Sequence, residues 1–233
     1  MPAFACAHRG LSSQKAENTL AAFRAAAEAG FPAVEMDLRC TADDEVVVLH
    51  DATVERTTGG KGRVDSLTSR ALAALATRNG PVPQLGELLA AMAGWNGLWN
   101  FEIKHPAALS GTLSLVRQRG LAGRALLSAM DPAVLEQAQL LAPEVPRGFI
   151  ALGPLEDDDL AAAKVAGCRW VNADHDFLDA DGVARIRQAG FRLGAYTVND
   201  PARAAELVRL GVECIITDRR EVLNEVGRPT ASW

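Results

Sequence analysis

Short apolar runs rich in β-branched residues alternate with longer Ala- and Leu-rich stretches of helical period along nearly the whole chain. The short runs have the length and composition of strands, and the longer stretches repeat apolar residues every three or four positions as helices do. Parallel strands need crossover connections, which helices supply in chains that alternate in this way. The alternation therefore predicts an α/β fold with about eight βα units.

The expected elements cover most of the chain. The expected strands are Ala3–Ala7, Ala33–Leu38, Val46–Leu49, Leu98–Ile103, Ala125–Ser128, Arg147–Ile150, Trp170–Asn172, Arg192–Thr197 and Cys214–Thr217, with Val46–Leu49 extending or abutting the second barrel strand. The expected helices are Thr19–Ala29, Gly86–Ala93, Ala107–Arg119, Pro132–Leu141, Asp157–Ala166, Asp181–Gln188 and Pro201–Leu210. Asn18 or Thr19, Asp131 and Asp200 are expected N-caps.

The length of 233 residues is close to that of a single (βα)8 barrel, so we expect one domain over residues 1–233. Residues 52–83 interrupt the alternation, because they are rich in Thr, Gly, Arg and Ser with a short helical stretch at Ser69–Ala76. We interpret them as an insertion over one end of the barrel. The Gly-rich run Thr57–Gly62 lacks the GxxxxGK[ST] spacing of a phosphate-binding loop, which favours a mobile surface loop.

Composition excludes several classes of protein. The net charge is −5 and no dense Lys/Arg block is present, which argues against nucleic-acid binding. The four cysteines lie far apart without CxxC spacing, so we expect small core residues rather than a disulfide or zinc framework. No basic, apolar leader opens the sequence and no apolar run approaches about 18 residues, so neither a signal peptide nor a membrane anchor is expected, and the expected location is the cytoplasm.

Three carboxylates occupy strand positions. The period of two places Glu35 and Asp37 on one face of the second strand, and Glu102 and Lys104 share a face near the end of the next barrel strand. Unpaired carboxylates inside a parallel barrel would cost several kcal/mol, so a cation or a basic partner is required. An oxygen-only ligand set suits Mg²⁺ or Ca²⁺ better than zinc, while a surface position or an Arg-paired cluster is the alternative.

Two histidines, His8 and His50, end apolar runs and are expected at the same rim of the barrel, where barrel active sites lie. Such residues are more often structural, but a pair beside three carboxylates suits acid–base catalysis of phosphoryl or acyl transfer. Arg9 and Lys104 add positive charge that can bind a phosphate or neutralise the carboxylates. The remaining histidines, His105 and His175, are not expected to take part.

The motifs stand in an order that resembles the glycerophosphodiester phosphodiesterase family. They are His8-Arg9-Gly10, Glu17-Asn18-Thr19, Glu35-x-Asp37, His50-Asp51 with Arg56-Thr57, Phe101-Glu102-Ile103-Lys104, Tyr196-Thr197-Val198-Asn199 and Ile216-Thr217-Asp218. Each motif is weak alone, whereas their order and spacing are specific and cover nearly the whole chain. This chain departs from the family pattern at Ala16, where the family usually has Pro, and at Asp44-Glu45, where it has Asp-Gly.

The resemblance implies a distorted (βα)8 TIM-type barrel. It also implies that Glu35, Asp37 and Glu102 bind one Mg²⁺ or Ca²⁺, and that His8 and His50 are the acid and base. Arg9 and Lys104 would hold the phosphate, and the Tyr196 ring would face the glycerol or alcohol moiety or pack in the core. Asn18 is expected to cap the following helix rather than to orient the first loop.

The expected reaction is metal-dependent hydrolysis of a small-molecule glycerophosphodiester to sn-glycerol 3-phosphate and an alcohol. Three alternatives stay open: a lyase that releases a cyclic phosphate, a Schiff-base aldolase with Lys104 as nucleophile, and a non-catalytic phosphate-binding barrel. The sequence predicts neither the alcohol, nor the preferred metal, nor the oligomeric state.

Overall fold

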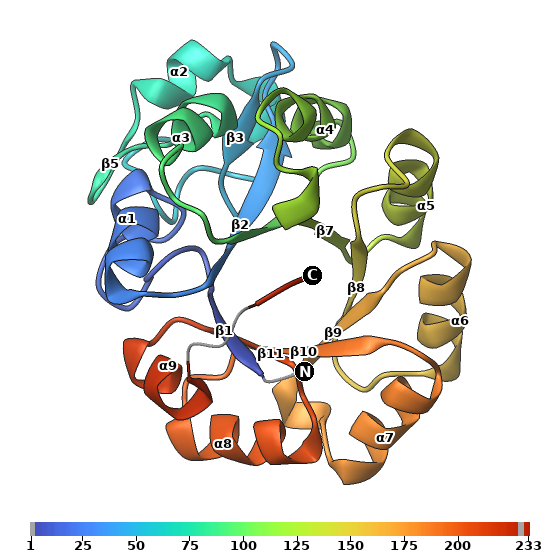
Figure 1. Ribbon diagram of the computed structural model, residues 1–233. Coiled ribbons are helices and arrows are strands. Elements are labelled where there is room, and N and C mark those ends of the chain that lie inside the picture. Colours follow the sequence, from blue (N-terminus) through green and yellow to red (C-terminus); the bar gives the residue numbers. More distant parts are fainter. Residues whose placement is uncertain (1–2, 228–230) are drawn as a thin grey trace.

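The computed structural model of the protein describes residues 3–227 and 231–233. Within them, one sheet has the strand order β1-β11-β10-β9-β8-β7-β6-β2-β3 and closes through a further pairing of β1 with β2. Its strands are β1 (Phe4–Ala7), β2 (Ala33–Cys40), β3 (Val46–Val48), β6 (Leu98–Ile103), β7 (Ala125–Ala129), β8 (Arg147–Ala151), β9 (Trp170–Asp174), β10 (Arg192–Tyr196) and β11 (Cys214–Thr217). β3 pairs antiparallel with β2 outside the ring, and the other strands form the closed parallel barrel in Figure 1. The predicted (βα)8 barrel is confirmed.

Helices surround the barrel (Figure 1). They are α1 (Leu20–Ala29), α3 (Leu85–Ala91), α4 (Ala108–Gln118), α5 (Pro132–Leu141), α6 (Asp157–Val165), α7 (Ala180–Gln188), α8 (Pro201–Leu210) and α9 (Arg220–Val226). Each of the seven helices expected outside the insertion is present within two residues of its predicted ends. The seven-residue helix α9 was not predicted.

Side-chain caps start several helices. Asp131 and Asp200 cap α5 and α8 as predicted, each accepting a hydrogen bond from a backbone N–H in the first turn. The Thr19 side chain caps α1 by accepting from the backbone N–H of Ala22, so of the two predicted caps for this helix Thr19 is the correct one. Asn18, which precedes it, is free to serve another purpose.

The barrel strands are buried on both faces because helices cover the outside. Every residue of β6, β7 and β8 is buried. The four cysteines are free; Cys6, Cys40 and Cys214 are buried as expected for core residues, and Cys168 is half-buried. None of the helices in the described part of the chain combines the length and the hydropathy that crossing a membrane requires.

Aromatic side chains fill the end of the barrel at which the strands begin. Trp233 makes edge-on contacts with Phe4 and Trp170, with ring centroids 5.4 and 5.5 Å apart, and the Arg192 guanidinium lies 4.0 Å above the Trp170 ring. In Figure 1 the segment that reaches Trp233 crosses the centre of the barrel. These aromatic side chains therefore close this end of the barrel.

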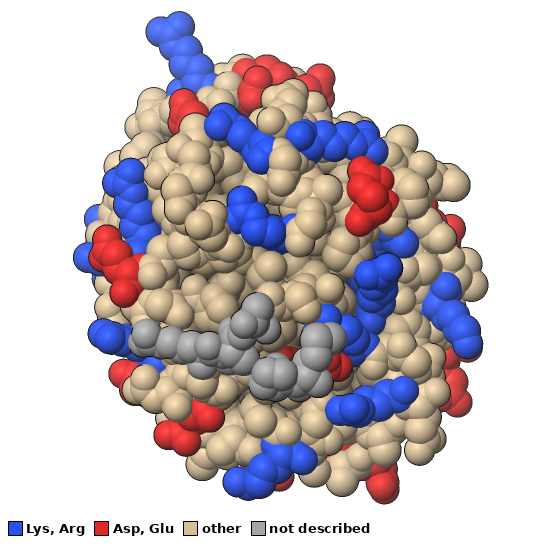
Figure 2. Space-filling model, viewed as in Figure 1, with Lys and Arg blue, Asp and Glu red and all other residues tan. Residues whose placement is uncertain are grey.

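Lys and Arg side chains are spread over the same face of the molecule (Figure 2). The helices run antiparallel to the strands, so their C-terminal turns lie at this end. Basic residues in those last turns include Arg117, Lys164, Arg187 and Arg209. Cations at these positions offset the negative end of the helix dipole, and Figure 2 shows Asp and Glu side chains among the basic ones on this face.

Residues 52–83 connect β3 to α3 and contain the 3-10 helix η1 (Val64–Ser66), the helix α2 (Ser69–Ala73) and the two-residue strands β4 (Ala76–Thr77) and β5 (Gly80–Pro81). The predicted helical stretch Ser69–Ala76 is shorter in the structure because the chain turns into the β4–β5 hairpin. A separate apolar cluster packs the segment onto β3; its buried members are Val47, Leu49, Val54, Val64, Leu72 and Val82.

Candidate active site

Three buried carboxylates meet at the end of the barrel where the strands finish. Glu35 and Asp37 lie on β2, and the parallel register pairs Asp37 with Glu102 on β6. One oxygen from each carboxylate lies within 4.8 Å of the others. The period of two along β2 and the register between the strands together bring the three groups onto one interior face.

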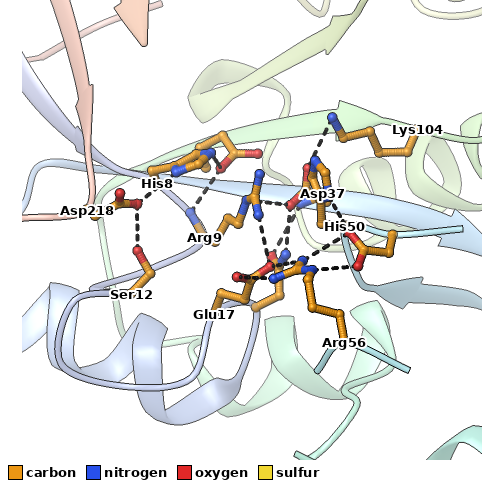
Figure 3. Close-up of polar contacts among 12 residues, drawn as sticks. His8, Arg9, Ser12, Glu17, Asp37, His50, Arg56, Lys104 and Asp218 are labelled. Carbon is orange, nitrogen blue, oxygen red and sulfur yellow. Dashed lines mark hydrogen bonds and ion pairs between the residues drawn. The ribbon is translucent and has the colours of Figure 1, made fainter. Parts of the chain in front are cut away.

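Two cations contact this carboxylate trio. The Arg9 backbone N–H donates to Glu35 Oε2 at 2.9 Å, and Arg9 Nε lies 3.2 Å from Asp37 Oδ2. Lys104 forms an ion pair with Glu102, and its Nζ lies 3.5 Å from Asp37 Oδ1. The predicted neighbours of the carboxylates are thus in contact with them, although two cationic side chains serve three carboxylates. Figure 3 shows Arg9 and Lys104 beside Asp37.

The trio retains an unused acceptor oxygen. Within residues 3–227 and 231–233, Glu35 Oε1 is buried and has neither a hydrogen bond nor an ion pair, whereas Asp37 Oδ1 and Glu102 Oε1 contact Lys104 alone. Burial, followed by repulsion from Asp37, raises the pKa of Glu35 well above its usual range and raises the pKa of Glu102 in the same direction. Three ionised carboxylates are therefore unfavourable here beside only two cationic side chains, and a bound cation would favour the ionised forms.

His8 follows β1 and is held by Asp218, which follows β11. His8 Nδ1 lies 2.8 Å from Asp218 Oδ1, and Ser12 and Asn199 also donate to this carboxylate. Burial alone would raise the pKa of Asp218, but the hydrogen bonds from His8, Asn199 and Ser12 outweigh it and hold the pKa well below its usual range. An ionised carboxylate can only accept, so the proton of the neutral imidazole resides on Nδ1 and Nε2 is left free.

His50 lies on the opposite side of Arg9 from His8 (Figure 3) and also contacts a carboxylate. Its Nδ1 lies 2.7 Å from Asp51 Oδ1, and Arg56 binds both oxygens of Asp51. Arg56 also donates to Glu17, which in turn accepts from Arg9. Burial lowers the pKa of His50, against the opposing influence of Asp37 and Asp51. Each histidine is thus oriented by a carboxylate that contacts its Nδ1, Asp218 for His8 and Asp51 for His50.

The turn after β1 requires an unusual backbone. Arg9 and Gly10 both have left-handed conformations, with φ of 57° and 77°. A Cβ atom on Gly10 would lie 2.6 Å from the carbonyl carbon of Ala22, so only glycine fits beside α1. This close approach directs the Arg9 backbone N–H toward Glu35 and its side chain toward Asp37.

Asn18 contradicts its predicted role. The sequence favoured helix capping, but Thr19 caps α1, and Asn18 Nδ2 instead donates to Asp37 Oδ2 at 2.7 Å. Asn18 also has a left-handed backbone, with φ of 56°, and is 2 % exposed. Its amide therefore joins the first loop directly to the carboxylate trio.

A pocket opens above these groups, lined by His8, Arg9, Glu35, His50, Asn100, Glu102, Lys104, Met130, Ile150, Leu152, Asn172, Tyr196, Thr197 and Ile216. The structure thus brings seven of the eight predicted site residues to its wall, and Asp37 lies fully buried directly beneath them. The Tyr196 ring lines the pocket while its hydroxyl donates to Ala151 O at 2.6 Å. His105 and His175 do not line it.

Sequence reasoning did not assign a role to three residues that the structure connects to the site: Glu17, Asp51 and Asp218. All three lie within the recognised motifs. Asp218 directly follows β11 at the rim where barrel sites lie, so its position alone could have marked it as a candidate. Its pairing with His8, 210 residues away, depends on the closure of the barrel.

Known proteins are similar to this chain in both sequence and fold. Residues 8–222 match the model of the family described as "Glycerophosphoryl diester phosphodiesterase family". A glycerophosphodiester phosphodiesterase of Caldanaerobacter subterraneus subsp. tengcongensis is 28% identical, over 96% of this chain and 97% of its own. A solved phosphodiesterase of Oleispira antarctica, in complex with the product sn-glycerol-3-phosphate, has a TM-score of 0.88 at 24% identity and covers 97% of this chain and 96% of its own.

The structure of a glycerophosphodiester phosphodiesterase from Agrobacterium tumefaciens is also similar, with a TM-score of 0.82 at 24% identity over 95% of this chain and 98% of its own. At these identities the solved structures establish the shared barrel, and the family match establishes membership. The match runs from His8, the first residue of the site, to α9 beyond Asp218. The chain belongs to the glycerophosphoryl diester phosphodiesterase family and is an enzyme of the phosphoric diester hydrolase class.

Proposed function

We propose that the protein hydrolyses glycerophosphodiesters to sn-glycerol 3-phosphate and an alcohol, with one Mg²⁺ or Ca²⁺ held by Glu35, Asp37 and Glu102 and with His8 and His50 as the acid and base. The observation that carries the proposal is the meeting of three incompletely paired buried carboxylates and two oriented imidazoles at one pocket. The product in the Oleispira antarctica structure belongs to the same chemical class.

The carboxylate trio suits a hard divalent cation. Its donor atoms are oxygens from three carboxylates, and no thiol or imidazole completes a zinc-like set within the described residues. The atoms available as ligands are Glu35 Oε1, which has no partner, and the Asp37 and Glu102 oxygens that contact only Lys104. When bound, such a cation would polarise a phosphate oxygen and offset charge that develops on the phosphoryl group.

The two histidines suit proton transfer in both directions. His8 and His50 each use Nδ1 to contact a carboxylate, which leaves Nε2 of each ring as the reactive nitrogen. One Nε2 would take the proton from the attacking oxygen, and the other, protonated, would give a proton to the oxygen of the departing alcohol as the P–O bond breaks. The attacking oxygen belongs to water or, in a first step, to the neighbouring glycerol hydroxyl.

Arg9 and Lys104 would bind the phosphate. Both line the pocket and both contact the carboxylate trio, so their positions are fixed before substrate arrives. Neutralising the trio and holding the phosphate are compatible roles, because guanidinium and ammonium groups can each donate to several oxygens. In the same proposal residues 1–233 form one catalytic domain, and the insertion 52–83 contributes Arg56 to the orientation of His50.

The test is hydrolysis of glycerophosphocholine by His8→Ala and His50→Ala in the presence of Mg²⁺ or Ca²⁺. Loss of one acid or base is expected to lower kcat by about 100- to 10,000-fold. His175→Ala is the matched control, because this histidine lies outside the pocket and should leave kcat unchanged. Activity near that of the unmodified protein in either of the first two variants would contradict the assignment.

A lyase that stops at the cyclic phosphate needs the same residues and is the second candidate. Phosphorus NMR of the products separates the two, because hydrolysis gives a phosphomonoester and the lyase gives a cyclic diester. The Schiff-base aldolase is disfavoured, because Lys104 contacts two carboxylates and acts there as a fixed positive charge.

A further inference from the structure

The wall of the pocket is divided into a charged and an uncharged side. The charged side is formed by β2, β6 and the residues that follow β1, β3 and β6. Its charged or titratable side chains are those of His8, Arg9, Glu35, His50, Glu102 and Lys104. The uncharged side comes from β7 to β11 and includes Met130, Ile150, Leu152, Asn172, Tyr196 and Ile216. Among the described residues, no Asp, Glu, Lys or Arg lines the pocket on this second side.

The uncharged side continues to the surface as apolar side chains. Met130 and Leu152 directly follow the adjacent strands β7 and β8, and they are 37% and 65% exposed. An exposed Leu on the outside of a helix is ordinary, as Leu140 on α5 shows at 85%. Apolar side chains at the mouth of an active-site pocket are different, because they form a continuous surface on which a ligand can be desolvated.

Asn172 brings an amide to this wall, which also carries the hydroxyls of Tyr196 and Thr197. Asn172 is 2% exposed, and its Nδ2 has no hydrogen-bond partner within residues 3–227 and 231–233. Gly194 lies opposite it in the β9–β10 register, and a Cβ atom there would approach Asn172 Oδ1 to 2.3 Å. The glycine therefore makes room for the amide, whose free donor can bind a hydroxyl or a carbonyl oxygen of a ligand in the pocket.

From this division of the pocket we infer that the enzyme prefers phosphodiesters in which one organic group carries an aliphatic chain. The inference rests on the proposed function, which places the phosphate on the charged side. The organic group then lies against Ile150, Met130 and Leu152, and Asn172 binds a polar atom close to the phosphate. Among the described residues, no carboxylate on this side lines the pocket for a choline or ethanolamine cation; Asp174, level with Tyr196 in the β9–β10 register, does not line it.

A cation could also be bound by aromatic rings, but this pocket is poorly suited to that. Tyr196 is the one aromatic residue among the described residues that line it. Recognition of quaternary ammonium groups generally uses a cage of several rings. The chain could belong to the departing alcohol or to an acyl ester on the glycerol, and both arrangements present the same chemistry to the wall.

The test compares kcat/KM for three substrates with Mg²⁺, each below its critical micelle concentration: glycerophosphocholine, glycerophospho-n-octanol and 1-octanoyl-glycerophosphocholine. Burial of each methylene strengthens binding by about two- to fourfold. We therefore expect kcat/KM for at least one of the two eight-carbon substrates to exceed that for glycerophosphocholine by about tenfold or more. A preference for the octanol diester would place the chain on the alcohol, and a preference for the octanoyl ester would place it on the glycerol.

A kcat/KM for glycerophosphocholine that equals or exceeds the kcat/KM of both eight-carbon substrates would overturn the inference and leave the proposed function standing. Absence of hydrolysis of all three substrates with either Mg²⁺ or Ca²⁺ would overturn both.

Leu152→Asn provides a second measurement. We expect this change to lower the ratio of kcat/KM for the preferred eight-carbon substrate to kcat/KM for glycerophosphocholine by about tenfold. The reason is that the aliphatic chain of the substrate loses its apolar partner at the rim of the pocket. Leu140→Asn is the matched control on the outer surface and should leave this ratio unchanged. An unchanged ratio in Leu152→Asn would overturn the inference.

Discussion

The two ends of the barrel differ in how their charged side chains are paired. At the end where the strands begin, Arg192 contacts the Glu213 carboxylate at 2.9 Å, the Ser232 carbonyl and the face of Trp170. At the other end Arg9 and Lys104 are shared among Glu35, Asp37 and Glu102, and Glu35 Oε1 has no hydrogen bond or ion pair within the described residues. Buried carboxylates that outnumber their cationic partners are costly, so their concentration at one end indicates a function there rather than a contribution to stability.

The largest expected effect tests this difference with one isosteric change at each end. Glu35→Gln removes a charge from the trio but retains an oxygen for the Arg9 N–H, and it is expected to lower kcat/KM by about 1,000-fold through loss of the cation site. Glu213→Gln makes the same change at the opposite end and should leave kcat/KM unchanged. Comparable losses in both variants would show that the two ends do not differ in function.

The second prediction concerns the cation and pH. The raised pKa of Glu35 and of Glu102 means that their protonated forms are favoured in the folded protein, so in metal-free protein their contribution to stability falls as pH rises from below about 4.5 through the folded values. A divalent cation needs the ionised forms and therefore competes with protons. At a concentration 100 times its Kd it is expected to stabilise the fold by about 2.7 kcal/mol at pH 8, and by less at pH 5.

This effect is measured as the shift in Tm on adding Mg²⁺ or Ca²⁺ at each pH. Glu35→Gln should abolish most of the shift at pH 8, and Glu213→Gln should retain it. A shift that is equal at pH 5 and pH 8 would contradict the role of the trio as ligands.

The opposite end is expected to affect stability and not catalysis. Trp233→Ala removes the ring that packs edge-on against Phe4 and Trp170 and is expected to cost about 2 kcal/mol of unfolding free energy, less than a fully buried Trp because the residue is half-buried. Chemical denaturation measures the loss, and kcat measured well below the transition should be unchanged. A fall in kcat without a fall in stability would contradict this division.

The difference between the ends also explains how much the sequence could predict. The barrel strands were predicted to within two residues because apolar runs and helical periods are local properties. The trio was predicted because Glu35 and Asp37 share a strand face and Glu102 stands near the end of the next barrel strand. These features can be read from a few neighbouring residues.

Contacts across the closure of the barrel could not be predicted in this way. Asp218 approaches His8 only because β1 pairs with β11, and Asn18 reaches Asp37 only because the first loop adopts left-handed backbone conformations. The packing of Trp233 against Phe4 has the same origin. Local patterns contain no information on which distant segments such a turn or such a closure brings together.

The smallest expected effect separates orientation of a histidine from direct catalysis. Asp51→Asn retains the size of the side chain and weakens the hydrogen bond that raises the pKa of His50, so that pKa, already lowered by burial, should fall further. The limb of the pH profile of kcat/KM that belongs to His50 should therefore move to lower pH, and the maximum should fall by about tenfold. Asp65→Asn is a matched control, because this exposed carboxylate pairs with Arg63 in the same insertion. A lower maximum with no movement of either limb would mean that Asp51 acts on the Arg56 network and not through His50.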